Sequence, residues 1–195
     1  MLSIELPNWY RLIRHSICHR TGIEGLKGIF KTGAIIPNDG SLIDTYPQSK
    51  ISYSRYHSLV SLFDFKNCNE DECLNQIHDW YRFFFDHEPV TVVILLSRQC
   101  LESKLIPNEK AVKDTKGTFD PIFIPHLEVF CPEPIPGDFF RGYLVICGVY
   151  EKIYEYYQHD GIFPGLFDKI DNFLKKHEEL YADPFGQLEK DIDNH

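Results

Sequence analysis

The sequence predicts an α+β fold, and three observations support that prediction. Roughly five to seven short apolar runs, several of them rich in β-branched residues, have the length and composition of strands. Other segments, such as 164–182, repeat apolar residues at helical spacing. The helices and strands do not alternate strictly along the chain, which disfavours a doubly wound parallel sheet.

Length and charge narrow the class of protein. A chain of 195 residues with 43% hydrophobic residues predicts one domain that buries a sizeable core. The net charge of −9 disfavours a general nucleic-acid binder. Residues 149–195 are strongly acidic, whereas residues 1–36 are locally basic and are candidates for holding a phosphate. We therefore expect the acidic residues 149–195 to form a helical extension of the domain.

The six cysteines are interpreted as buried thiols, because none form the C-x-x-C spacing of a zinc or redox site. No metal is expected, since the nine histidines show no ligand-spaced pair on one helix or strand. No apolar run approaches the roughly 20 residues that span a bilayer, and no secretory signal is recognisable. The sequence thus predicts a cytoplasmic protein without a membrane segment.

The opening unit is the best defined. Ile17–His19 indicates a strand end, and Thr21 with Glu24 three residues later indicates a capping box that starts a helix. Gly33 then predicts a left-handed helix end, followed by a short extended piece over 34–36.

The remaining elements follow in chain order. Residues 38–50 are turn-rich, and residues 97–120 form a second loop-rich stretch. Strands are expected at 51–54, 59–65, 90–96, 122–130 and 143–147, and helices at 71–85, 149–158 and 164–182.

Three places carry side chains that suit a binding site. His19, Arg20 and Thr21 lie where a strand meets a helix start, although His19 equally suits a satisfied, partly buried histidine. Polar residues Tyr53, Ser54, Arg55 and Ser61 lie in the next strand region, where they either bond neighbouring backbone or meet a ribose. Glu128 lies in an apolar strand, where it is either solvated at an edge or buried for a purpose.

These three places, in this order, resemble the ADP-ribosyltransferase superfamily. The segment HRTGIEGLKGIFKTGAIIP (19–37) is similar to its opening segment, VSLFDF (60–65) to its second strand, and HLEVFCPEPIPGDFFRGYLVI (126–146) to a later segment in which a Glu begins a strand. The nearest likeness is to DarT-like DNA ADP-ribosyltransferases and RNA 2′-phosphotransferases. The resemblance covers about residues 15–148, and it implies that this core is a split mixed sheet with peripheral helices. The middle motif has no clear Ser-Thr-Ser, so its four candidates stay open, and Glu133 is a rival of Glu128.

The resemblance also implies roles. NAD would be the substrate, with His19 bonding a ribose hydroxyl and the Arg20 backbone holding the nicotinamide amide. Arg55 would face the pyrophosphate or the ribose, and Glu128 would bond the 2′-OH of the nicotinamide ribose. The reaction would be ADP-ribosyl transfer to a macromolecular acceptor, or hydrolysis of NAD. The alternatives are an RNA 2′-phosphotransferase-like enzyme, against which the net charge counts, and a non-catalytic binding protein that keeps the fold.

Four lysines precede Glu128 in the second loop-rich stretch. Lys104, Lys110, Lys113 and Lys116 are either a solvated face or the contact for a negatively charged acceptor, whether nucleic acid or protein.

Overall fold

The computed structural model describes residues 9–40, 52–66, 90–114, 127–147 and 153–177. These residues combine helices with an antiparallel sheet, which confirms the predicted α+β class. The chain divides into two compact units, 1–162 and 163–195. The second unit contains α7 (Leu166–Lys176), which carries its buried apolar residues at helical spacing as the sequence predicts.

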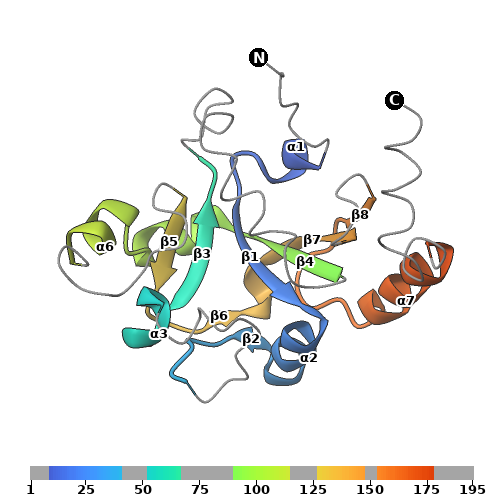
Figure 1. The fold of residues 1–195 in the computed structure, drawn as a ribbon, viewed down its shortest axis with the longest axis horizontal. Helices are drawn as coiled ribbons and strands as arrows, with labels where there is room; N and C mark the ends of the chain where they lie inside the picture. The colour runs from blue at the N-terminus through green and yellow to red at the C-terminus, as the bar shows by residue number, and fades with distance from the viewer. Residues whose placement is uncertain (1–8, 41–51, 67–89, 115–126, 148–152, 178–195) are drawn as a thin grey trace, which may run out of the picture. The chain divides into compact units, whose positions relative to one another are not determined.

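Six strands form the main sheet of the first unit, in the order β5-β3-β1-β4-β7-β8 (Figure 1). Every pair among these described strands is antiparallel, so the expectation of a mixed sheet is wrong. The strand bounds are β1 Ile17–Gly22, β3 Val60–Asp64, β4 Val90–Leu96, β5 Glu128–Cys131, β7 Phe140–Cys147 and β8 Tyr154–Tyr157.

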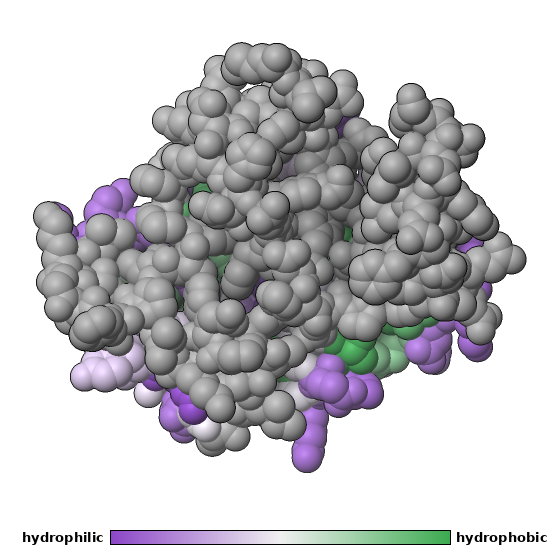
Figure 2. Space-filling model, viewed as in Figure 1, coloured by the Kyte–Doolittle hydropathy of each residue, from purple (hydrophilic) through white to green (hydrophobic). Residues whose placement is uncertain are grey.

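Helices cover both faces of this sheet. Cys18 pairs with Phe63 and with Leu95, so these three side chains share a face, and the short helix α1 (Tyr10–Ile13) packs on it. α2 (Ile23–Thr32) lies on the other face, where the ring of Phe30 contacts Tyr143 at a centroid distance of 6.1 Å. Hydrophilic residues occupy most of the described rim visible in Figure 2.

A second, two-stranded sheet joins distant parts of the chain. β2 (Ala34–Ile35) pairs with β6 (Ile135–Pro136), and the Gly137 amide donates to the Gly33 carbonyl at 2.8 Å. β2 ends the unit that starts with His19, whereas β6 follows the strand that starts with Glu128. The two segments are therefore fastened to each other about 100 residues apart in sequence.

Two local predictions are wrong because side chains override the pattern. Residues 53–56 form the short helix α3 (Tyr53–Tyr56) rather than a strand, since the Ser52 hydroxyl caps it by accepting from the Arg55 amide at 3.3 Å. Residues 154–157 form β8 rather than a helix. Their aromatic side chains favour a strand, and β7 offers an edge to pair with. The main sheet therefore extends past the expected core boundary at residue 148.

The second loop-rich stretch also contains helices: α5 (Arg98–Leu101), the 3-10 turn η2 (Glu102–Lys104) and α6 (Asn108–Asp114). Another 3-10 turn, η3 (Gly137–Phe139), leads into β7. The expected helix at 71–85, residues 122–126 of the expected strand and most of the turn-rich segment 38–50 lie outside the described residues.

The predicted capping box at Thr21 is wrong. Thr21 lies inside β1, and Gly22 is the residue that precedes α2, with no side-chain cap. The Thr21 hydroxyl donates to the Gly22 carbonyl at 3.2 Å instead. A six-residue ladder with β4 holds Thr21 in the strand, so Gly22 rather than Thr21 is the residue at the start of the helix.

Two glycines of α2 give a matched test of the fold. Gly33 ends the helix at φ 73°, whereas Gly28 lies in the helix interior with open space where a Cβ would stand. We expect Gly33→Ala to lower the free energy of unfolding by about 1 kcal/mol, because Ala disfavours the left-handed region. Gly28→Ala should raise it by about 0.5–1 kcal/mol. Urea unfolding of both variants checks the opposite signs, and a stabilised Gly33→Ala would contradict the described helix end.

Candidate functional site

Strands β1 and β3 are neighbours in the main sheet, but they pair over only part of their length. The β1–β3 ladder consists of Ile17 with Asp64 and Cys18 with Phe63, whereas β1 pairs with β4 at six positions. Beyond Cys18, β1 keeps its β4 partner but leaves the ladder with β3. We call this point, bounded by His19 on β1 and Ser61 on β3, the seam.

His19 bridges the seam with its side chain. Its Nδ1 lies 3.0 Å from the Ser61 carbonyl oxygen. A carbonyl only accepts hydrogen bonds, so Nδ1 carries the proton and donates it. Burial lowers the pKa of His19 to about 4, against a smaller opposing effect of the Ser61 bond, and the nearby Arg20 charge lowers it further. The ring is therefore neutral at pH 7, and its Nε2 keeps a lone pair that can accept a hydrogen bond.

Ser61 also bonds the candidate catalytic carboxylate. Its hydroxyl donates to Glu128 Oε1 at 2.5 Å. The Glu128 residue is only 2% exposed, although β5 is the edge strand of the sheet. The sequence left open whether Glu128 is solvated at a sheet edge or buried. The structure shows that it is buried and hydrogen-bonded.

The strand register shows on which face of the sheet Glu128, Ser61 and His19 lie. Glu128 pairs with Phe63, and Phe63 pairs with Cys18, so these side chains share one face of the sheet. Ser61, two residues from Phe63, shares that face, whereas alternation along β1 assigns His19 to the other. Ser61 joins the two because its main chain meets His19 at the seam while its hydroxyl meets Glu128.

The other middle-motif candidates have structural partners. The ring of Tyr53 is buried against Phe130, with centroids 4.9 Å apart, and its hydroxyl donates to Asp114 at 3.2 Å. Ser54 is buried and lies 3.1 Å from the Ser52 hydroxyl. Ser61 is thus the candidate that directly contacts Glu128.

Arg55 and Arg20 differ in setting. Arg55 is half-buried, and its guanidinium lies close to Gly40, where an added Cβ would stand 3.0 Å from Nη2. Arg20 is 8% exposed and pairs with Val93 in the middle of the sheet, on the face that Cys18 also shares. Its side chain therefore lies on the same side as Glu128, a placement that the sequence pattern left undecided.

The three described lysines of the second loop-rich stretch lie in different settings. Lys104 pairs with Glu133 at 2.6 Å, and that bond raises the pKa of Lys104. Lys110 and Lys113 are exposed on α6, between Glu109 and Asp114. Lys116 lies outside the described residues. The rival Glu133 is exposed and paired with Lys104, so it lacks the buried setting of Glu128.

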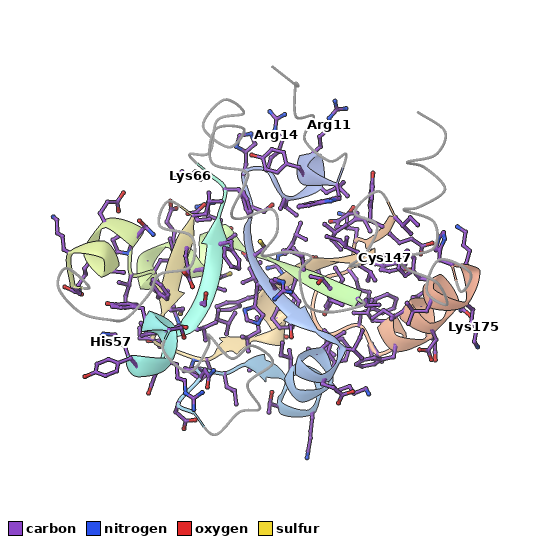
Figure 3. All side chains as sticks on the ribbon, in the orientation of Figure 1. Arg11, Arg14, His57, Lys66, Cys147 and Lys175 are labelled. Atoms are coloured by element: carbon purple, nitrogen blue, oxygen red, sulfur yellow. The ribbon has the colours of Figure 1, made fainter. Side chains whose placement is uncertain are left out.

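The locally basic N-terminal segment does not form one patch either. Arg11 and Arg14 are exposed on α1 at one end of β1 (Figure 3). Lys27 and Lys31 belong to α2 at the other end of that strand, and Lys27 pairs with Glu24. Folding therefore separates charges that are close in sequence.

The possible metal ligands in the described part of the chain do not gather into one cluster. No group of three or more His, Cys, Asp or Glu side chains there is arranged to hold a metal ion. Cys18, Cys100, Cys131 and Cys147 are free thiols, and burial raises the pKa of Cys18. None of the described helices has the length and hydropathy to cross a membrane.

Sequence reasoning missed one residue next to the site. The Asn108 side-chain amide, at the start of α6, donates to the Glu128 carbonyl at 2.8 Å. Pro107-Asn108 is a recognisable helix start, but nothing in the local pattern links it to a strand 20 residues later.

No protein-family model matches the chain, and no curated protein matches it.

The low pKa of His19 gives a prediction for stability. Between pH 6.5 and about 4 the unfolded chain binds a proton at His19 that the folded chain does not, so stability falls as the pH falls through this window. This effect is worth up to about 3 kcal/mol. Urea unfolding at pH 7 and pH 4.5 should show a smaller pH dependence for His19→Gln than for the unaltered protein. Equal pH dependence would contradict a neutral, half-buried His19.

Proposed function

We propose that the protein cleaves NAD at the nicotinamide ribose and transfers ADP-ribose to a macromolecular acceptor or to water. The observation that carries this proposal is the chain of contacts from His19 through Ser61 to Glu128. It joins residues from the three segments that resemble ADP-ribosyltransferases. The early end of the β1–β3 ladder supports the split sheet implied by that resemblance.

His19 has the chemistry needed to orient a ribose. Its Nδ1–H is committed to the Ser61 carbonyl, so the ring is held in one tautomer. The remaining Nε2 accepts a hydrogen bond from a hydroxyl group, as a ribose would offer. Because the pKa is about 4, this acceptor persists throughout the neutral range.

Glu128 has the chemistry needed to stabilise the transition state. Breaking the bond between ribose C1′ and the nicotinamide nitrogen releases neutral nicotinamide and leaves positive charge on the sugar, as in glycoside hydrolysis. A preorganised carboxylate in a water-poor setting stabilises such charge more than one in water does. Ser61 holds one carboxylate oxygen. Because Glu128 and His19 lie on opposite faces of the sheet, our proposal places the nicotinamide ribose at the seam, where Glu128 bonds its 2′-OH from one face and His19 bonds another hydroxyl from the other.

The acceptor is a hydroxyl or similar nucleophile that attacks C1′ from the side opposite nicotinamide; it forms the new bond to C1′ as the bond to nicotinamide breaks, and it releases its proton to solvent. Lys110 and Lys113 are the exposed lysines on α6, the helix whose first residue bonds the Glu128 backbone. They suit an acidic acceptor, although Glu109 and Asp114 on the same helix reduce the local positive charge. Transfer and hydrolysis share every step up to the loss of nicotinamide.

Substitution of the two glutamates tests the proposal. We expect Glu128→Gln to reduce nicotinamide release from NAD by at least about 100-fold, the rate equivalent of roughly 2.7 kcal/mol of transition-state stabilisation. Its stability should change little, because Gln keeps an oxygen that accepts from Ser61. The measurement is release of labelled nicotinamide, with and without candidate DNA, RNA and protein acceptors.

Glu133→Gln is the matched control, since it removes an exposed carboxylate from the same region and should keep full activity. Three results would count against the proposal. Unaltered protein that neither binds nor cleaves NAD would favour a non-catalytic binding protein. Equal turnover by Glu128→Gln would remove Glu128 from the chemistry. Unfolding of Glu128→Gln would make its role structural.

A further inference from the structure

The outer edge of β5 is covered by a short segment that precedes α6. β5 is the last of the described strands in the sheet, so one of its sides has no partner strand among the described residues. Ile106 pairs with Phe130 there as an isolated bridge, with the Ile106 amide donating to Phe130 at 2.7 Å and the Phe130 amide donating to Ile106 at 3.2 Å. The side-chain amide of Asn108 also donates a hydrogen bond to the Glu128 carbonyl. We call Ile106 and Asn108 together the β5 edge clamp.

The clamp acts on alternate residues of the strand. In an antiparallel sheet the main-chain groups of successive residues point to opposite sides of the strand. Leu127 directs its carbonyl inward, where it accepts from Asp64 on β3, whereas Phe130 directs its groups outward to Ile106. The Glu128 carbonyl also points outward, and the Asn108 side chain takes the place that a strand amide would occupy.

This arrangement limits rotation of the Glu128 main chain. The inner side of β5 is held by its register with β3, and the outer side by the clamp. The main-chain conformation of Glu128 sets the direction of its side chain. The Ser61 hydroxyl can form its hydrogen bond only when that side chain places the carboxylate within bonding distance. Loss of the Asn108 bond would release one side of the residue that carries the carboxylate.

We propose that Asn108 is a positioning residue that holds the Glu128 carboxylate in place through the Glu128 main chain. It contacts neither NAD nor the reacting atoms. The inference rests on the proposed function for its catalytic consequence, but its structural consequence can be measured without NAD. Since Asn108 begins α6, it also ties that helix to the candidate catalytic strand.

Three variants separate positioning from general stability. Asn108→Ala removes the donor without adding charge, and Asn108→Gln keeps an amide donor on a longer side chain. Asn172→Ala is the matched control, since Asn172 is an exposed asparagine on α7 in the second unit. We expect Asn108→Ala to lower kcat for nicotinamide release by about threefold to tenfold, the rate equivalent of one hydrogen bond. KM for NAD should stay within about twofold, Asn108→Gln should recover part of the loss, and Asn172→Ala should match the unaltered protein.

A second readout covers the case in which the unaltered protein does not cleave NAD. In ¹³C NMR of the labelled Glu128 carboxyl, Asn108→Ala should move and broaden the resonance relative to the unaltered protein, because a looser carboxylate spends less time bonded to the Ser61 hydroxyl. Absence of NAD cleavage with a changed Glu128 resonance would overturn the proposed function and keep the positioning role. An unchanged resonance, or unchanged kcat in an active protein, would overturn the positioning role.

Discussion

The interaction on which the structure depends is the interrupted pairing of β1 with β3. Two residue pairs join these strands at one end. Beyond them, the His19 imidazole donates to the Ser61 carbonyl of β3, in place of a main-chain hydrogen bond. That exchange fixes the tautomer of His19 and the position of Ser61 at once. The Ser61 hydroxyl in turn donates to Glu128. The point where β1 and β3 stop pairing therefore brings together residues from β1, β3 and β5.

The rest of the first unit supports this assembly from outside. The β2–β6 pair fastens the segment after α2 to the segment after β5, so the chain pieces that carry His19 and Glu128 cannot drift apart independently. The buried strand β4 holds β1 along its full length, while the clamp of Ile106 and Asn108 closes the outer edge of β5. Rigid elements on each side of the seam are what a preorganised site requires.

The sequence predicted the parts of this structure that depend on local signals. Apolar β-branched runs gave β4 and the core of β7, and Gly33 gave the end of α2. Predictions that depend on a pairing partner were wrong. Thr21 was expected to cap a helix, but its pairing with β4 keeps it in a strand. The aromatic run of β8 was expected to be helical, but it pairs with β7. His19, Ser61 and Glu128 were recognisable as residue types, but their contacts come from strand order and register. Asn108 carried no signal, because its partner lies on a neighbouring strand.

In the proposed function, His19 presents a neutral Nε2 acceptor to a ribose hydroxyl of NAD. The most direct measurement is ¹⁵N NMR of histidine-labelled protein at pH 7, with the His19 signals assigned by His19→Gln and recorded with and without NAD. We expect a proton on Nδ1 and an unprotonated Nε2 whose resonance moves when NAD is added, while the Nδ1–H bond to Ser61 persists. A protonated Nε2, or His19 signals that saturating NAD leaves unchanged, would contradict this expectation.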